Sequence, residues 1–330
     1  ELGEAIGEEC QAEDVSIVLG PAVNIKRSPL CGRNFEYFSE DPYLASELAK
    51  SYISGVQSKQ VGTSIKHFAV NNQEFRRMSC SSELDERALR EIYLSAFEAA
   101  VKEAKPWTVM CSYNRINGVY ASENKKLLSD ILRDEWGFDG YVMSDWGAVN
   151  DRVEGLKAGL DLEMPGSSGV NDEEIIKAVE SGRLDESVLD TAVERILSRI
   201  FAYWENKINT VFPYKEHHEL AKRIELESAV LLKNEDQLLP LKEGKKDRVD
   251  RSVCEGTPVS RRGKLPYQSL SSKRRLGIAE WSFYAMGYTL DDSAAEELAE
   301  EAVALAAKSD AAVIFAGLPD AYESEGYDRR

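Results

Sequence analysis

The chain has 330 residues, of which 43% are hydrophobic and 30% are charged, and its formal net charge is −17. This acidic balance argues against nucleic acid as a partner, because binding to phosphates requires a basic surface. No apolar run approaches the roughly 18 residues that span a bilayer, so we expect no membrane partner. The five cysteines are dispersed and form no CxxC pair, which predicts neither a zinc site nor a disulfide framework.

Segments with strand character alternate with segments of helical periodicity over the first two-thirds of the chain. Strands are predicted at 15–19, 62–68 and 108–113, in a segment that ends at 145, and at 160–162. Helices are predicted at 42–58, 85–104, 125–136, 150–158, 171–181 and 185–201, with Asp41 as the N-cap of the first. This alternation predicts a parallel sheet with helices outside it.

Polar side chains recur directly after the predicted strands, namely Asn24, Arg33, Lys66, His67, Tyr113, Asp145 and Glu163. In a (β/α)₈ barrel the active site lies at the carboxyl ends of the strands, so this pattern favours an α/β fold of the barrel type. The alternative is a doubly wound open sheet. That fold would favour a glycine-rich phosphate loop, and the chain contains neither GxGxxG nor GxxxxGK[ST].

In the last third of the chain, the regular alternation of strands and helices is predicted to end. Residues 202–241 are interpreted as a linker and a bridging helix, and residues 284–330 as the start of a second α/β domain. That start consists of an alanine-rich helix at 293–308 and a buried strand at 311–318.

The segment 242–283 between these two parts is anomalous in composition. Residues 242–275 contain 11 Lys or Arg against four Asp or Glu, and they show neither helical nor strand periodicity. We interpret the segment as a stretch in which the coding frame was shifted locally and then restored. The alternative is a basic, flexible loop or a tail that binds nucleic acid, and the net charge of the whole chain argues against nucleic-acid binding.

Three motifs carry the strongest functional signal. They are GYVMSDWGA at 140–148, in which an apolar strand ends in Asp145, KHFAVNNQEFRR at 66–77, and YESEGYDR at 322–329. Together they resemble the family 3 glycoside hydrolases, the β-glucosidase group. The resemblance extends to SPLCGRNFE at 28–36 and LLKNEDQLLPL at 231–241, and it covers most of 1–241 and about 284–330.

The resemblance implies a TIM-type (β/α)₈ catalytic barrel over residues 1–201, followed by an α/β sandwich domain that carries the acid/base loop. The first barrel strands of the family have no counterpart in this chain, nor has most of the second domain. We therefore expect an incomplete barrel and only the start of the sandwich. The chain begins inside a helical pattern without an initiator Met, and we interpret it as a fragment whose compartment the sequence does not determine.

A retaining glycosidase uses two carboxyl groups, one that attacks the anomeric carbon and one that protonates the leaving oxygen. By resemblance, Asp145 is the nucleophile and Glu325 the acid/base, with Glu323 as the alternative. This predicts an exo-acting hydrolase that removes terminal β-D-glucosyl residues through a glycosyl-enzyme on Asp145. The alternatives are a β-xylosidase of the same family and an inactive sugar-binding fragment. No cofactor or metal is expected, because two carboxyl groups suffice.

The resemblance also implies the substrate-binding residues, which are Arg33, Lys66, His67, Arg77, Met110, Tyr113 and Trp146. The expected partners are β-glucosides or β-linked oligosaccharides. Arg77 would help to keep Asp145 charged, and Tyr113 could donate a hydrogen bond to it. For Met110 a role in the apolar core is the alternative. Asp161 and Glu163 are expected to support the site rather than to carry chemistry.

Overall fold

The computed structural model describes residues 1–237, 239–240, 285–287, 295–309, 312–314, 316–317 and 322–329. The chain divides into one compact unit of Glu1–Ser228 with Glu325–Arg330, and a second unit of Ala229–Ser324. The anomalous segment predicted at 242–283 lies outside the described residues.

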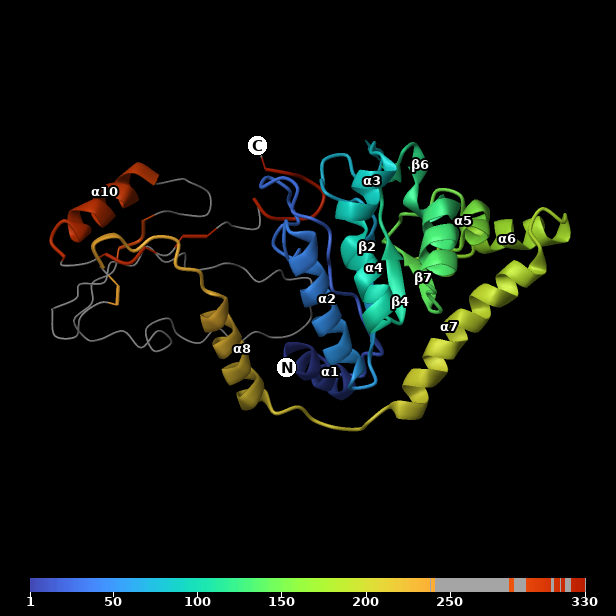
Figure 1. Ribbon diagram of the computed structural model, residues 1–330, viewed down its shortest axis with the longest axis horizontal. Coiled ribbons are helices and arrows are strands. Elements are labelled where there is room, and N and C mark those ends of the chain that lie inside the picture. Colours follow the sequence, from blue (N-terminus) through green and yellow to red (C-terminus); the bar gives the residue numbers. More distant parts are fainter. Residues whose placement is uncertain are drawn as a thin grey trace. The chain divides into compact units, whose positions relative to one another are not determined.

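Four short parallel strands form the centre of the first unit (Figure 1). They are β1 (Ile17–Val18), β2 (Gly62–Phe68), β4 (Thr108–Cys111) and β7 (Tyr141–Ser144), and they lie in the order β1-β2-β4-β7. The register pairs Ile17 with Gly62, Ser64 with Thr108, and Thr108 with Tyr141. The order of a doubly wound sheet reverses partway across, whereas this order follows the sequence. These strands therefore do not support the doubly wound alternative.

Strands that follow one another in both sequence and space, joined by crossovers of one hand, place their connecting helices on one face of the sheet. Two isolated bridges, Ala22 to Lys66 and Met143 to Leu162, extend the parallel pairing on either side. Among the described strands, the sheet is open and ends at β1 and β7. An α/β fold with a parallel sheet is thus confirmed, and the barrel stays a prediction.

The connecting segments agree with the predicted helices to within a few residues over most of the first unit. They are α1 (Leu2–Ala12), α2 (Pro42–Gln57), α3 (Glu86–Ala88), α4 (Ser95–Ala99), α5 (Arg152–Ala158), α6 (Val170–Glu180), α7 (Glu186–Asn206) and α8 (Tyr214–Ser228), with π-helical η1 (Leu89–Tyr93), η2 (Ala100–Ala104) and η4 (Lys126–Glu135). A small second sheet contains β3 (Ser81–Ser82), β5 (Arg115–Ile116) and β6 (Val119–Tyr120), which η3 (Ala121–Glu123) follows. Asp41 caps α2 as predicted, because its carboxylate accepts the Tyr43 N–H at 3.0 Å.

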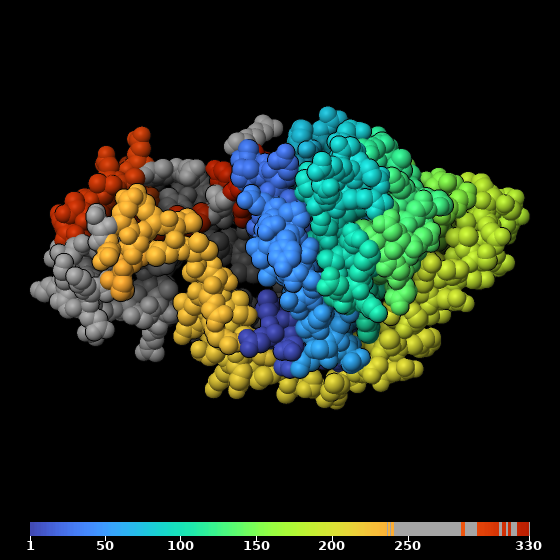
Figure 2. Space-filling model, viewed as in Figure 1, coloured from blue at the N-terminus to red at the C-terminus, as the bar shows by residue number. Residues whose placement is uncertain are grey.

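Both faces of the sheet are buried. On one face Ile65, Val109 and Val142 belong to the same apolar cluster as Ile53 of α2 and Phe97 of α4. Figure 2 shows this face of the unit, on which α2 lies beside α4 and η2. On the other face, alternate residues of the strands form a cluster of Met110, Tyr141 and Met143, against which Ile17, Leu162, Met164 and Ile196 pack.

The contacts at residues 201–228 and 325–330 belong to one compact unit, and the predicted domain bounds stay a prediction. Helix α7 continues past residue 201 to Asn206, because Tyr203 packs against Val56 and Val61 and donates a hydrogen bond to Asp14 at 3.1 Å. Helix α8 also belongs to the first unit. The final residues, Glu325–Arg330, belong to the first unit as well, whereas the prediction assigned them to the second domain.

The second unit contains η5 (Glu235–Gln237) and α10 (Ala295–Ala306), which lies within the predicted helix at 293–308. Of the strand predicted at 311–318, the described residues 312–314 and 316–317 lie in no strand, and Ile314 is exposed. In the part of the chain that the structure describes, every helix is too short or too polar to span a lipid bilayer.

A buried carboxylate ties β7 to two helices. One oxygen of Asp161 accepts the Val142 N–H at 2.7 Å and pairs with Arg133 of η4 at 2.6 Å. The other oxygen pairs with Arg195 of α7 at 3.0 Å. The Asp161 side chain is 2% exposed, so this carboxylate compensates two cations inside the fold, which is the supporting role expected from the sequence.

We expect Asp161→Asn to lower the free energy of unfolding by about 3 kcal/mol, because it removes the charge that compensates two partly buried guanidinium groups. Urea denaturation measures the change. The matched control is Asp139→Asn, whose carboxylate pairs with Arg199 but is 83% exposed, and for which a change below about 1 kcal/mol is expected. An equal decrease in the free energy of unfolding in the two variants would contradict the stabilising role of Asp161.

Candidate active site

Three neighbouring strands bring predicted site residues to one edge of the sheet. His67 lies near the end of β2, Tyr113 follows β4, and Asp145 follows β7 directly. The Asp145 N–H donates to the Cys111 carbonyl at 3.3 Å, which continues the pairing of β7 with β4. Since parallel strands end at the same edge, these side chains meet although about 80 residues of sequence separate the first from the last.

The two carboxylate oxygens of Asp145 have different surroundings. Oδ1 accepts the Trp146 N–H at 2.7 Å and the Tyr113 hydroxyl at 2.9 Å. Oδ2 is buried and accepts no hydrogen bond from the described residues; it lies 3.6 Å from Nε2 of His67. Two donors therefore fix the orientation of the carboxylate and leave the lone pairs of one oxygen unused.

The pKa of Asp145 is the result of opposing effects. Burial raises it above the usual value for an aspartate, because a charged carboxylate loses its hydration there. The donors Trp146 N–H and Tyr113 hydroxyl, together with the charges on Arg33 and Arg77, act in the opposite direction. This is the effect expected of Arg77 from the sequence.

His67 is fully buried, and its surroundings keep it neutral. Burial and the positive charges of Arg33, Lys66 and Arg77 lower the pKa of its imidazole well below the usual value. The contact between His67 and Asp145 is therefore not an ion pair. Asn24 holds the backbone in place, since its side chain accepts the His67 N–H at 2.8 Å and donates to the His67 carbonyl at 2.9 Å. Sequence analysis noted Asn24 only as a polar residue after a strand.

Glu325 is held between two arginines. Its Oε1 lies 3.4 Å from Nη2 of Arg33, and its Oε2 lies 3.1 Å from Nη2 of Arg77. The Arg77 guanidinium stacks over the Tyr113 ring at 4.3 Å, and the Tyr113 hydroxyl donates to Asp145. One continuous set of contacts thus joins the two carboxyl groups that sequence analysis selected.

The pKa of Glu325 is lowered in this arrangement. Partial burial alone would raise the pKa of its carboxyl group, but the charge on Arg33, the hydrogen bond and charge of Arg77, and the charge on Lys66 outweigh this effect. The two arginines therefore hold Glu325 as a carboxylate. An acid that protonates a leaving oxygen needs the opposite shift.

The remaining predicted residues take different places. Arg33 is almost fully buried and pairs with Glu36, which also lies 3.6 Å from Lys66. Trp146 is half exposed next to Asp145. Met110 is buried in the apolar cluster of β4 and β7, which is the place expected of a core residue. Glu323, the alternative acid/base, belongs to the second unit.

Glu74 is a residue whose part in the site sequence analysis missed. Its carboxylate is fully buried, pairs with Arg77 at 2.7 Å, and accepts the Gly326 N–H at 2.8 Å and an Asn71 amide N–H at 3.3 Å. Burial raises the pKa of Glu74, which these donors and Arg33 oppose. An acidic residue three positions before Arg77 was visible in the motif, but its link to Gly326 was not.

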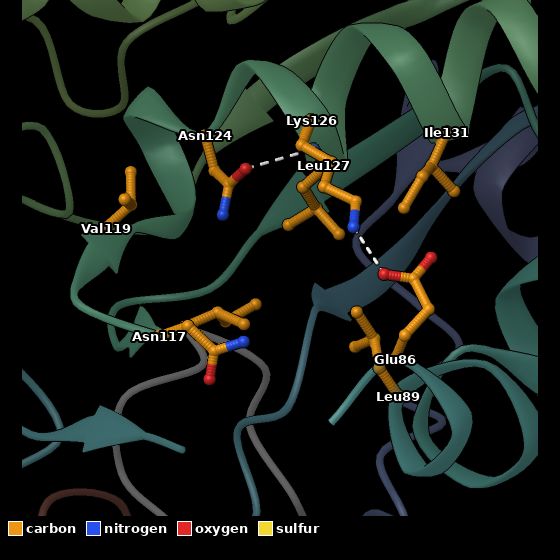
Figure 3. Close-up of a pocket in the computed structure, with 9 residues that line it drawn as sticks. Glu86, Leu89, Asn117, Val119, Asn124, Lys126, Leu127 and Ile131 are labelled. Atoms are coloured by element: carbon orange, nitrogen blue, oxygen red, sulfur yellow. Dashed lines mark hydrogen bonds and ion pairs between the residues drawn. The ribbon is translucent and has the colours of Figure 1, made fainter. Parts of the chain in front are cut away.

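A cavity of about 220 Å³ lies apart from these residues (Figure 3). Its wall contains Leu127, whose N–H donates to the Asn124 side chain at 3.0 Å, and an ion pair between Lys126 and Glu86. None of the predicted site residues lines it. Among the described residues, no three His, Cys, Asp or Glu side chains come together in a way that could hold a metal ion.

The sequence profile of the "Glycosyl hydrolase family 3 N terminal domain" matches residues 1–199. The chain belongs to glycosyl hydrolase family 3. This family 3 chain is 56% identical over 340 residues to "Thermostable beta-glucosidase B" of Acetivibrio thermocellus, and the match covers 99% of the chain and 45% of that relative.

Two further relatives have similar coverage. The family 3 chain is 46% identical over 349 residues to an "Exo-alpha-(1->6)-L-arabinopyranosidase" of Bifidobacterium longum, covering 99% of the chain and 45% of that protein. It superposes on the crystal structure of a β-glucosidase of Bifidobacterium adolescentis with a TM-score of 0.88 and 46% identity, covering 99% of the chain and 49% of that structure. The chain thus spans about half the length of these three relatives, and their names differ in the sugar.

We expect Tyr113→Phe to raise the pKa of Asp145, because the charged carboxylate loses a donor while its burial is unchanged. Titration of carbon-13-labelled aspartate side chains by NMR measures this shift. The control is Tyr43→Phe, which removes a hydroxyl from an exposed residue of α2 and should leave the Asp145 titration unchanged. An unchanged pKa in Tyr113→Phe would show that its hydrogen bond does not stabilise the carboxylate.

Proposed function

We propose that this chain carries the catalytic site of a retaining, exo-acting β-glycosidase that acts on terminal β-D-glucosyl residues. The observation that supports it best is the pair of carboxyl groups linked through Tyr113 and Arg77, one on Asp145 and one on Glu325. Membership of family 3 and the names of the β-glucosidase relatives support the reaction and the sugar.

In the proposed reaction Oδ2 of Asp145 attacks the anomeric carbon, because this oxygen has no donor to occupy its lone pairs. The bond from the anomeric carbon to the leaving oxygen breaks, and Glu325 supplies the proton that this oxygen needs. In the second step Glu325 takes a proton from water, and the water oxygen displaces Asp145 from the sugar. Both steps together invert the anomeric carbon twice and retain its configuration.

The ionised state of Glu325 suits the second step, in which it acts as a base. For the first step it has to be protonated, and the charges on Arg33 and Arg77 oppose that. Both arginines are also proposed to bind sugar hydroxyls, with Lys66, His67 and Trp146. A sugar that takes over the guanidinium N–H groups would release Glu325 from these contacts and raise its pKa.

We also propose that the sheet is part of a (β/α)₈ barrel. The one-directional strand order and the position of the site at the carboxyl ends of the strands support this proposal. Polar groups at that edge come from three neighbouring strands, as barrel active sites require.

Asp145→Asn is expected to lower the hydrolysis of phenyl β-D-glucoside by roughly 10⁴-fold or more, because an amide cannot form the glycosyl-enzyme. Release of phenol measures the rate, and circular dichroism checks that the variant is folded. The control is Asp185→Asn, which removes a carboxylate that caps α7 away from the site and should leave the rate nearly unchanged. Turnover retained in Asp145→Asn would rule out Asp145 as the nucleophile.

Glu325→Ala is expected to slow hydrolysis of phenyl β-D-glucoside by roughly 10²–10⁴-fold, because the poor leaving group needs an acid. The dinitrophenolate group of dinitrophenyl β-D-glucoside leaves without protonation, so Glu325→Ala should slow the formation of the glycosyl-enzyme from this substrate far less. Added azide should restore turnover of that substrate and give β-glucosyl azide, since an anion needs no base. If Glu323→Ala behaves in this way and Glu325→Ala does not, the acid/base is Glu323.

A further inference from the structure

One carboxylate close to the end of the chain accepts three backbone N–H groups from distant loops. Oδ1 of Asp328 accepts the Gly32 N–H at 3.1 Å and the Glu74 N–H at 2.9 Å, and its Oδ2 accepts the Phe75 N–H at 2.9 Å. These partners lie 296, 254 and 253 residues away in the sequence. A carboxylate only accepts hydrogen bonds, so it satisfies all three donors at once.

The loops that Asp328 joins are the two that carry the arginines of the site. Gly32 directly precedes Arg33, and Glu74 and Phe75 precede Arg77. The same carboxylate therefore sets the distance between these loops and holds the segment that carries Glu325, three residues upstream. Charge-assisted hydrogen bonds of this type are about twice as strong as neutral ones.

Backbone contacts on both sides of Asp328 complete the docking. The Gly326 N–H donates to Glu74 at 2.8 Å, and the Arg329 N–H donates to the Leu30 carbonyl at 2.8 Å. A cavity of about 350 Å³, lined in part by Arg27, Gln73 and Asp328, borders the same place. These backbone hydrogen bonds act together with the three to Asp328 in holding the segment against the loops.

We propose that Asp328 is a positioning residue, which docks residues 325–329 onto the loops at 28–36 and 71–77 and so places Glu325 between Arg33 and Arg77. Asp328 does not touch the reacting atoms in this role. It acts through the position of Glu325, and this part of the inference rests on the proposed function. A mutation far from the reacting atoms that displaces a catalytic group by about 1 Å can reduce the reaction rate by about 10²-fold.

Asp328→Asn is the variant that tests the proposal, because its side chain has nearly the same size but loses the negative charge, and an NH₂ group that can only donate replaces one of the two acceptor oxygens. Hydrogen exchange, followed by NMR in the unaltered full chain and in the variant, measures docking at the amides of Gly32, Glu74 and Phe75. We expect these three amides to exchange at least about tenfold faster in the variant, while amides in β4 and β7 stay protected.

The effect on the reaction is measured with two leaving groups. We expect Asp328→Asn to slow hydrolysis of phenyl β-D-glucoside by roughly 10–100-fold and that of dinitrophenyl β-D-glucoside by only a few-fold, because a misplaced acid matters only where a proton is needed. A merely structural defect would slow both substrates equally. The matched control is Asp185→Asn, which also removes a carboxylate that accepts a backbone N–H. It should change neither the ratio of the two hydrolysis rates nor the exchange of the three amides.

Unchanged exchange at all three amides would overturn the docking role of Asp328. Faster exchange with an equal loss on both substrates would overturn its role in placing Glu325. If the unaltered chain hydrolyses neither substrate, the proposed function fails, and the exchange measurement by itself decides whether Asp328 docks the segment.

Discussion

The site depends on the compensation of a buried guanidinium group, that of Arg33, and a largely buried one, that of Arg77, by carboxylates from several parts of the chain. Arg33 is paired with Glu36 and Glu325, and Arg77 with Glu74 and Glu325. Cations in such surroundings are stable only where anions and hydrogen bonds replace their hydration. Glu325 thus compensates both arginines, and these two contacts add to the hydrogen bonds of Asp328 in holding residues 325–329 at the strand ends.

The same cations set different protonation states for three neighbouring groups. They act together with burial on His67, whose imidazole stays neutral. They act against burial on Asp145, where burial prevails, and on Glu325, where the cations prevail. Exposure explains the difference, because Asp145 is nearly buried whereas Glu325 is half exposed and lies in contact with both guanidinium groups. Two carboxyl groups in one network thus have pKa values shifted in opposite directions. These directions are the reverse of those that an ionised nucleophile and a protonated acid need, so the bound sugar would have to change them.

Helices and strands were predictable from the sequence where neighbouring residues determine them. Strand β2 occupies residues 62–68 as predicted, and Asp41 caps α2, because apolar runs and capping residues act within a few positions. The helix predicted at 185–201 ended too early, since α7 continues to Asn206 and Tyr203 finds apolar neighbours from α2 and from the residue before β2. For Met110, two interpretations were open in the sequence, and the structure packs it against Met143.

The sequence by itself determined the α/β class, the order of most elements, the family, and the types of side chain that the site contains. Through the resemblance to family 3 it also pointed to Tyr113 as a donor to Asp145, and the structure has this hydrogen bond. Only the tertiary structure decided which carboxylate faces which cation, that Glu74 binds Gly326, and that Asp328 joins the two arginine loops. Contacts between residues more than 250 positions apart leave no periodic or local trace in a sequence, and the burial that shifts a pKa exists only once such contacts have formed.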